Sequence, residues 1–297
     1  MTRLQANTLL LISGAMWGMG FVAQSTAMEA IGPFLFIGLR FAIAGISMLP
    51  FALREGRQAP VSLSPVDWRN FLCVGLLLFG GMAAQQVGLM TTTVTNSGFL
   101  TGLYVVMVPF LGVILFRQWP HSIVWPAALC ALTGIWLLSG GSAVSLRTGD
   151  WLTILCAAFW ALQVIYIARS AGRTGRPVTL AVTQFFVTAA ISLAIALSVE
   201  PIVLTEILRA LPELLYAGIF SGGIAFTLQV VGQRYTTAPQ AAIFLSTEAV
   251  FAALFGAVFL GERLPPAGLL GCSLIFSAIL LVEVVPALRS SSRRPAS

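Results

Sequence analysis

Residues 85–93 read QQVGLMTTT and residues 229–237 read QVVGQRYTT, so a Gln, a Gly and a Thr-Thr pair recur 144 positions later in the chain. Two further pairs lie at nearly the same offset: Trp17 with Trp160 at 143, and Pro120 with Pro265 at 145. Because the offset is nearly constant across three regions, the sequence predicts an internal duplication.

The composition predicts that both copies lie in a membrane. The chain has 297 residues, of which 58% are hydrophobic and 9% charged, and its mean hydropathy is +0.95. A soluble domain carries roughly 25% charged residues, so a water-soluble globule, a disordered tail and a fibrous repeat are all excluded. A spanning helix needs about 20 apolar residues, and ten such helices with short loops would use nearly the whole chain. No length remains for a sizeable soluble catalytic domain.

Charges, prolines and turn residues divide the chain into ten apolar runs. They cover residues 6–28, 33–53, 70–90, 94–116, 121–141, 151–169, 178–199, 211–233, 238–260 and 266–286. We therefore predict an all-α membrane protein with ten transmembrane helices around a central cavity. Spans 1–5 occupy residues 1–142, and spans 6–10 with a cytoplasmic tail occupy residues 143–297, within one integral membrane unit. Because five is odd, the halves would cross the membrane in opposite directions, as the inverted repeats of secondary transporters do.

The arginines predict the orientation, since the chain contains no lysine. With ten spans, twelve of the sixteen arginines fall on the side that holds both termini, three fall on the other side, and Arg40 lies inside the second span. Cytoplasmic loops carry an excess of basic residues, so both termini are expected in the cytoplasm. The net charge of +6 then reflects membrane topology, and we expect no nucleic-acid partner.

The sequence contains no motif for enzyme chemistry. We find no Walker A motif, dinucleotide fingerprint or HExxH, and the single histidine excludes any two-histidine metal site. The two aspartates, Asp67 and Asp150, cannot form the acidic pairs of an intramembrane prenyl transferase. All four cysteines lie in apolar runs without a CxxC pair, which is typical of small buried apolar residues. We expect a protein that is not an enzyme and that needs no cofactor or metal.

Three segments resemble a known family. Residues 14–18 read GAMWG, residues 38–41 read GLRF, and residues 255–263 read FGAVFLGER. With ten spans in two inverted halves, the chain resembles the EamA-type branch of the drug/metabolite transporter superfamily over residues 6–286. The first half departs from the Gly-Glu-Arg ending, because residues 116–120 read FRQWP and lack the Glu. The chain also looks like the aromatic amino-acid exporters of this branch, and the resemblance implies a bacterial inner membrane.

Two ionisable residues are predicted inside spans, where they are costly and commonly functional. Glu248 follows ten residues of the ninth span, and the repeat places Tyr104 opposite it. It is a candidate proton-coupling group or contact for a substrate amine; the alternative is a protonated Glu bonded to a neighbouring helix. Arg40 is interpreted first as a structural or gating residue that snorkels or pairs with Glu29, and otherwise as an attractor of anions. Glu262, at a span end, is also assigned a structural or gating role.

Aromatic and amide side chains are the other candidates for substrate binding. Trp17 and Trp160 lie at mid-span, where they would stack on an apolar substrate or pack as a core pair. Helical spacing puts Gln24 and Gln163 on the faces of their tryptophans. The remaining predicted substrate contacts are Phe79, Gln85, Gln86, Asn96, Tyr104 and Ser246.

These residues predict a secondary active or facilitative transporter that exports small amphipathic metabolites by alternating access. Amino acids with aromatic or large apolar side chains are the leading substrate class. The alternatives are a broad-specificity drug or metabolite exporter and a nucleotide-sugar carrier, although anionic nucleotide sugars would demand several cations facing the cavity. The expected partners are the small-molecule substrate and the lipid bilayer, and the sequence is compatible with a monomer.

Overall fold

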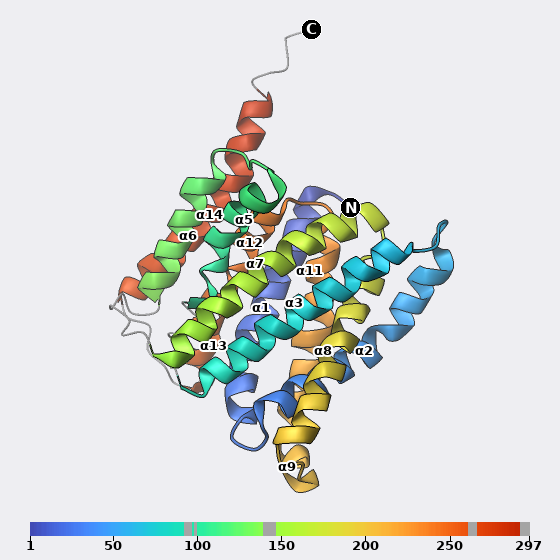
Figure 1. The fold of residues 1–297 in the computed structure, drawn as a ribbon. Helices are drawn as coiled ribbons and strands as arrows, with labels where there is room; N and C mark the ends of the chain where they lie inside the picture. The colour runs from blue at the N-terminus through green and yellow to red at the C-terminus, as the bar shows by residue number, and fades with distance from the viewer. Residues whose placement is uncertain (92–96, 98–99, 139–146, 261–265, 292–297) are drawn as a thin grey trace.

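A computed structural model describes residues 1–91, 97, 100–138, 147–260 and 266–291. Within these ranges the chain is helical apart from short connections, and it contains no strand (Figure 1). Seven of its helical segments are long and apolar enough to cross a membrane. They cover residues 3–24, 33–58, 65–89, 148–174, 177–199, 211–233 and 238–259.

The remaining three predicted spans contain shorter apolar helices, at residues 104–116, 124–137 and 266–282. Parts of the fourth and fifth predicted spans, at 94–96, 98–99 and 139–141, lie outside the described residues. The membrane-embedded, all-helical class is therefore supported, while ten crossings and the inverted repeat stay predictions.

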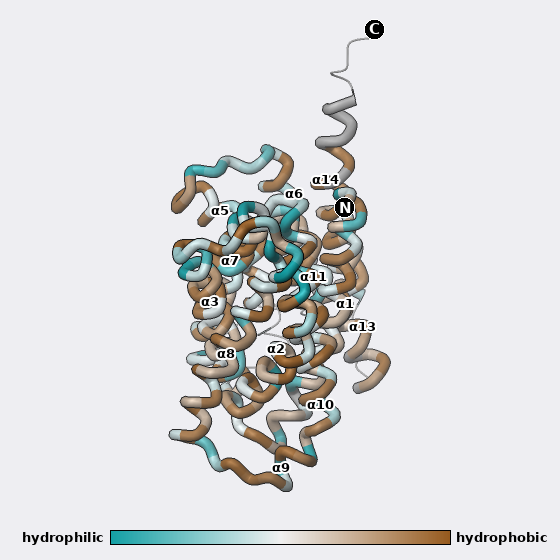
Figure 2. Tube along the Cα trace, turned by 90° about the vertical axis from the view of Figure 1, so that its right-hand side faces the viewer, coloured by the Kyte–Doolittle hydropathy of each residue, from teal (hydrophilic) through white to brown (hydrophobic). Residues whose placement is uncertain are grey.

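The helices follow the apolar runs closely. In chain order they are α1 (Arg3–Ala27), α2 (Pro33–Gln58), α3 (Pro65–Leu89), α5 (Tyr104–Phe116), α6 (Val124–Leu138), α7 (Thr148–Thr174), α8 (Pro177–Val199), α9 (Leu204–Arg209), α10 (Leu211–Leu215), the π-helix η1 (Tyr216–Ile224), α11 (Ala225–Gln233), α12 (Ala238–Leu245), α13 (Glu248–Leu260) and α14 (Pro266–Ser291). Hydrophilic segments gather at the upper end of the bundle near α7, whereas the segment around α9 at the lower end is mostly hydrophobic (Figure 2).

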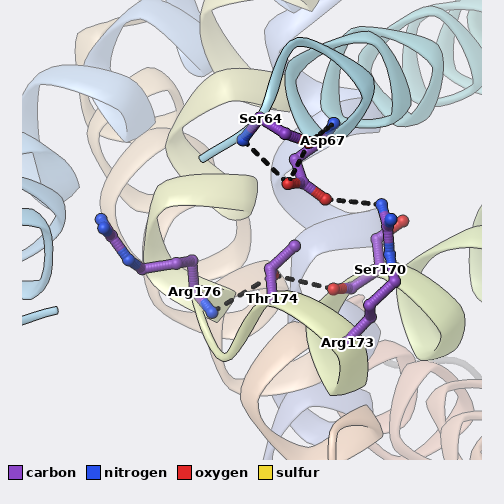
Figure 3. A network of polar contacts seen from close by, with 6 residues as sticks. All are labelled: Ser64, Asp67, Ser170, Arg173, Thr174 and Arg176. Carbon is purple, nitrogen blue, oxygen red and sulfur yellow. Dashed lines mark hydrogen bonds and ion pairs between the residues drawn. The ribbon is translucent and has the colours of Figure 1, made fainter. Parts of the chain in front are cut away.

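Polar contacts fix the helix ends at the start of α3 and the end of α7. Ser64 and Asp67 form a capping box, in which the Asp67 carboxylate accepts from the Ser64 N–H at 2.9 Å. The other Asp67 oxygen pairs with Arg173 of α7 at 2.5 Å (Figure 3). Because half of the Arg173 side chain is exposed, solvent screens this ion pair and it adds little to stability. Its main effect is to align the two helix ends.

Each of the four most extensive helix pairs joins the two halves of the chain. They are α2 with α8, α3 with α7, α6 with α14 and α1 with α13. Small residues allow these helices to approach closely: a Cβ on Gly134 of α6 would lie 2.6 Å from the carbonyl oxygen of Gly271 in α14. Close backbone contact through small residues is the usual way in which helices associate in lipid. The described residues of the two halves therefore pack against each other along four helix pairs.

Two carboxylates cap the α2–α8 pair at its opposite ends. Glu55, near the end of α2, accepts hydrogen bonds from the backbone N–H groups of Val178 and Thr179 at 3.0 and 2.8 Å. Glu200, just after α8, accepts from the N–H groups of Phe34 and Leu35, both at 2.8 Å. A carboxylate satisfies free N–H groups at a helix N-terminus and is stabilised by the helix dipole. The two helices are thus antiparallel and held at both ends.

Gly32 is the position at which this arrangement is most sensitive to one added carbon. A Cβ on Gly32 would lie against the Glu200 carboxylate, 2.5 Å from its Oε2. Gly32→Ala should therefore displace the carboxylate from the α2 N-terminus. Since hydrogen bonds to a charged group contribute about 1.5–3 kcal/mol, we expect a clearly lower melting temperature in detergent.

The matched control for Gly32→Ala is Gly172→Ala. A Cβ on Gly172, inside α7, would meet nothing within 4 Å. Alanine is a better helix former than glycine, so Gly172→Ala should melt at or above the wild-type temperature. Equal melting of Gly32→Ala and wild type would contradict the role assigned to Glu200.

Candidate functional site

A cavity lies in the middle of the bundle. It holds about 510 Å³ of space free of protein atoms, including its opening. Sixteen residues line it: Trp17, Gly20, Phe21, Gln24, Arg40, Met82, Gln85, Thr101, Tyr104, Trp160, Val164, Ser221, Phe226, Gln229, Leu245 and Glu248. Its lining combines apolar and aromatic side chains with a few polar groups, as small-molecule sites usually do.

Most of the lining consists of residues that are 143 or 144 positions apart. Six such pairs occur: Trp17 with Trp160, Phe21 with Val164, Met82 with Phe226, Gln85 with Gln229, Thr101 with Leu245, and Tyr104 with Glu248. Four lining residues have no lining counterpart at these offsets: Gly20, Gln24, Arg40 and Ser221. We call the six pairs the matched frame of the cavity, and we call Gly20, Gln24, Arg40 and Ser221 its polar corner.

Two of the lining segments are broken helices. Residues 246–247 form a turn between α12 and α13, and residues 102–103 form a turn before α5. The backbone bonds match at an offset of 144, since Ala249 N–H donates to the Ser246 carbonyl at 3.2 Å and Val105 N–H donates to the Gly102 carbonyl at 3.1 Å. The continuous spans predicted at 94–116 and 238–260 are thus interrupted at equivalent points.

Side chains near the second break explain why a continuous helix gives way there. The Ser246 hydroxyl donates to the Ile243 carbonyl and the Thr247 hydroxyl donates to the Phe244 carbonyl, both at 2.7 Å. Hydroxyls that bond nearby carbonyls compete with the helical pattern. As a result Glu248 begins α13 and stands in its first turn.

The predicted eighth span, 211–233, also departs from a regular α-helix. Residues 216–224 form η1, whose wide turns close at Ala225, where the N–H donates to the Phe220 carbonyl five residues earlier. π-Helical turns occur frequently at functional sites. Gly222 and Gly218 allow η1 to lie against α2, since their Cβ atoms would come within 3.2 Å of Ala44 and 2.7 Å of Ile43. This packing brings Ser221 to the cavity.

Three rings form an aromatic wall. Phe226 stacks on Trp160 with ring centroids 5.7 Å apart at 18°, and it contacts Trp17 at 4.6 Å. Trp17 and Trp160 face each other at 6.3 Å. The Trp17 indole N–H donates to the Ser221 carbonyl at 3.0 Å, which fixes its orientation. The wall is suited to contact with an apolar or aromatic group.

Arg40 forms the centre of the polar corner. It is 2% exposed, and its Nη1 donates to Gln24 Oε1 at 2.9 Å while its Nη2 donates to Ser221 Oγ at 3.2 Å. Its guanidinium also lies 5.1 Å from the Phe41 ring centroid. Among the described residues no carboxylate pairs with it, and its Nε has no acceptor. The pairing with Glu29 considered above does not occur, because Arg40 bonds only neutral groups.

Glu248 is the carboxyl group of the cavity. It is partly accessible from the cavity, and none of the described side chains donates a hydrogen bond to its carboxyl oxygens. Tyr104 lies within its electrostatic reach and is 4% exposed, with a hydroxyl that has no partner. The first turn of a helix favours a negative charge. The alternative reading of Glu248, as a carboxyl bonded to a neighbouring helix, therefore finds no partner in the described part of the chain.

The structure brings seven of the residues predicted from sequence to the cavity: Trp17, Gln24, Arg40, Gln85, Tyr104, Trp160 and Glu248. Four others do not line it. The Gln163 amide lies one layer behind, between Gln184 at 3.1 Å and Gln229 at 3.3 Å. The Gln86 amide donates to Met28 Sδ at 2.8 Å.

Ser246 bonds its own helix, and Phe79 is half-buried on α3 without reaching the cavity. Asn96 and Glu262 lie outside the described residues. The helical periodicity that grouped these side chains was too coarse to separate the cavity face from the layer behind it.

Sequence reasoning did not select Phe226, Ser221, Gln229 and Thr101 as substrate contacts. Gln229 is 144 positions from the selected Gln85, so the duplication carried a signal that could have identified it. Thr101 accepts a hydrogen bond from Gln85 at 3.1 Å. Ser221 reaches the cavity through the π-helix η1. Within the described residues, no group of three or more His, Cys, Asp or Glu could hold a metal ion.

Comparison with known proteins gives concordant matches. The sequence matches the EamA-like transporter family twice, over residues 4–140 and 147–284. It is 31% identical to an uncharacterized transporter of Archaeoglobus fulgidus over 95% of this chain and 87% of that protein. It is 26% identical to the uncharacterized inner membrane transporter YedA of Escherichia coli over 90% of this chain and 87% of that protein. A solved crystal structure superposes with a TM-score of 0.80 at 20% identity, covering 99% of this chain and 100% of that one.

Proposed function

Because the chain belongs to the EamA-like transporter family, a family of membrane transporters, we propose that it exports small amphipathic metabolites by alternating access. The leading substrates are amino acids with aromatic or large apolar side chains. The single observation that carries this proposal is the cavity, in which Trp17, Trp160 and Phe226 form an apolar wall beside one buried guanidinium and one carboxyl.

The matched frame of the cavity supports alternating access. Transporters with inverted repeats place their substrate at the repeat interface, between discontinuous helices. Here six pairs at a nearly constant offset line the cavity, and the broken segments before α5 and α13 bear Tyr104 and Glu248 at equivalent points. Residues 1–142 and 143–297 would then exchange conformations around a fixed site.

The energy source is proposed to be either the substrate gradient alone or exchange with protons at Glu248. A carboxyl at the first turn of α13 can bind a proton or a substrate amine, and competition between the two would couple their movements. We further propose a bacterial inner membrane location with both termini in the cytoplasm, on the basis of the arginine distribution.

A nucleotide-sugar carrier is less well supported. Phosphate groups are recognised by clusters of basic residues, and Arg40 is the one basic residue among those that line the cavity. A broad-specificity exporter shares the aromatic wall, so the substrate range must decide between that function and amino-acid export.

Counterflow into proteoliposomes tests the proposal. Vesicles containing the purified protein would be loaded with unlabelled substrate and offered labelled Phe, Trp, Leu, Thr, Glu or UDP-glucose. We expect exchange of Phe, Trp and Leu, and little of Glu or UDP-glucose. Movement of UDP-glucose without any amino acid would overturn the amino-acid proposal.

Trp17→Ala should reduce counterflow of Phe and Trp roughly tenfold. The change removes one ring of the aromatic wall, and an aromatic contact between Trp17 and the substrate would contribute about 0.5–1.5 kcal/mol, of which 1.4 kcal/mol corresponds to about tenfold in affinity. Trp151→Ala is the matched control, because Trp151 is 60% exposed on the surface of α7. Equal counterflow in both variants would show that Trp17 is not part of the substrate site.

A further inference from the structure

We propose that the cavity recognises both charged ends of an α-amino acid, with Arg40 binding the carboxylate and Glu248 binding the ammonium group. This inference rests on the proposed function and assigns the two polar contacts within it. It gives Arg40 a direct role in specificity, beyond the structural role first expected from the sequence.

Arg40 is placed to accept an anion. Its guanidinium has five N–H donors, of which the two recorded bonds go to the neutral acceptors Gln24 Oε1 and Ser221 Oγ. Its Nε is buried without an acceptor, and the side chain lines the cavity. A buried guanidinium without a carboxylate partner is costly in free energy. An anionic group that enters the cavity and pairs with Arg40 would therefore bind favourably.

Glu248 offers the opposite charge. Its carboxyl reaches the cavity from the first turn of α13 and receives no hydrogen bond from the described side chains. With Arg40, it gives the cavity one cation and one anion. A zwitterion compensates both charges, whereas an amine or a carboxylic acid leaves one of them unpaired in apolar surroundings.

Contacts with α1 place the two groups at different levels of that helix. The Glu248 backbone lies near Gly14, where a Cβ would come within 3.3 Å of its N atom. The Ser221 hydroxyl bound to Arg40 lies near Gly20, where a Cβ would come within 2.6 Å of it.

One zwitterion can contact both groups, because both side chains line the same cavity. An α-amino acid carries its two charges at one end, which leaves its side chain free to lie on the aromatic wall.

The origin of these residues agrees with a specificity role. Gly20, Gln24, Arg40 and Ser221 are the four lining residues without a lining counterpart, and Glu248 is opposite Tyr104. The duplicated frame alone therefore supplies neither charge. Both charges come from positions at which the halves differ.

The test pairs two variants with two truncated ligands. Purified wild type, Arg40→Gln and Glu248→Gln would be titrated with phenylalanine, with phenethylamine, which lacks the carboxylate, and with 3-phenylpropionate, which lacks the ammonium. Affinity is measured for each ligand by its stabilisation of the protein against heat, which grows with the ratio of ligand concentration to Kd.

We expect each truncated ligand to bind wild type at least tenfold more weakly than phenylalanine. Arg40→Gln should weaken phenylalanine binding at least tenfold, while its affinity for phenethylamine stays within twofold of wild type. Glu248→Gln should weaken phenylalanine binding by the same factor and leave the affinity for 3-phenylpropionate unchanged. Retained binding of the truncated ligand shows that the variant is folded.

Gln24→Glu is the second variant, should Arg40→Gln fail to fold. It would place a carboxylate at the Gln24 oxygen that already lies 2.9 Å from Arg40 Nη1. This internal partner should compete with ligand carboxylates for Arg40. We therefore expect weaker binding of phenylalanine and 3-phenylpropionate and unchanged binding of phenethylamine.

Two results would overturn the assignment. If the Arg40→Gln and Gln24→Glu proteins lost affinity for phenylalanine and for phenethylamine by the same factor, Arg40 would only support the fold. Unchanged phenylalanine binding in Glu248→Gln, with loss of proton-driven accumulation alone, would leave Glu248 as a coupling group. In both cases wild-type amino-acid transport would persist, so the proposed function would stand; absence of amino-acid binding and counterflow in wild type would refute both.

Discussion

Replacing Gly18 with leucine is expected to abolish counterflow and to lower the melting temperature strongly. Gly18 is the point at which α1 touches the backbone of α13: a Cβ there would lie 2.5 Å from Phe251 Cβ and 2.6 Å from the Ala252 N atom. The Ala252 N atom is part of the helix backbone and Phe251 Cβ is bonded directly to that backbone, so neither can rotate away. The two helices must therefore separate to admit the side chain.

The functional loss follows from what the two helices hold. Trp17 precedes Gly18 on α1, and Glu248 stands in the first turn of α13. Separation of the helices would move the aromatic wall away from the carboxyl, so binding should fail even in molecules that stay folded. Helix association in lipid depends on such close contact between small residues.

A graded series makes the Gly18 prediction specific. Gly18→Ala should reduce counterflow and melting temperature partly, and Gly18→Leu should leave no measurable exchange. Gly172→Leu is the control, since a Cβ at Gly172 meets nothing within 4 Å. Wild-type exchange by Gly18→Leu would show that the α1–α13 contact is not required.

The sequence was sufficient for the class of fold because apolar run length is a direct physical requirement of the bilayer. The runs at 33–53 and 178–199 fall within α2 and α8, and the run at 70–90 ends one residue beyond α3. Their ends were less well predicted: α2 continues to Gln58 and α3 begins at Pro65, because polar residues extend a helix beyond the apolar run. The length of an apolar run therefore indicates where a helix crosses the membrane, but it does not indicate where the helix begins or ends.

The irregular segments could not be predicted in the same way. An apolar run gives no sign that the helix turns at residues 246–247 or widens over Tyr216–Ile224. The turn at residues 246–247 is accompanied by hydroxyl bonds within the same segment, whereas η1 lies against a neighbouring helix through glycine contacts such as Gly222 with Ala44. These irregularities place Glu248 and Ser221 at the cavity, so apolar run length alone could not locate the site.

The candidate residues were predicted best where one strong signal singled them out. Trp17 and Trp160 are related by the duplication, Glu248 is charged at mid-span, and all three line the cavity. Gln163 had only helical spacing from Trp160 to support it, and it lies in the layer behind. Phe226 had only the duplication, without any polarity to draw attention to it.

Phe226→Ala is expected to cause the second large effect, by emptying the centre of the aromatic cluster. Phe226 is 1% exposed, and its ring contacts the rings of Trp17, Trp160, Phe41 and Phe185 at 4.6–6.2 Å between centroids. Lipid is as apolar as the protein interior, so little transfer free energy is lost. The cost of the cavity remains: roughly 100 Å³ at about 24 cal/mol per Å³ is about 2.4 kcal/mol.

Phe226→Met distinguishes the loss of packing from the loss of an aromatic surface. Methionine fills most of the volume and is flexible enough to adapt, and it is the residue at the related position 82. We expect Phe226→Met to melt within a few degrees of wild type, whereas Phe226→Ala melts far lower. Thermal unfolding in detergent measures this difference.

Transport by the same two variants then tests the wall itself. If the ring of Phe226 holds Trp160 in position for the substrate, Phe226→Met should still exchange leucine but should lose most of its preference for phenylalanine and tryptophan. Phe226→Ala should lose exchange of all three, because Trp17 and Trp160 are no longer held by the ring between them. A Phe226→Met protein with wild-type preference for aromatic substrates would show that the selectivity lies elsewhere in the cavity.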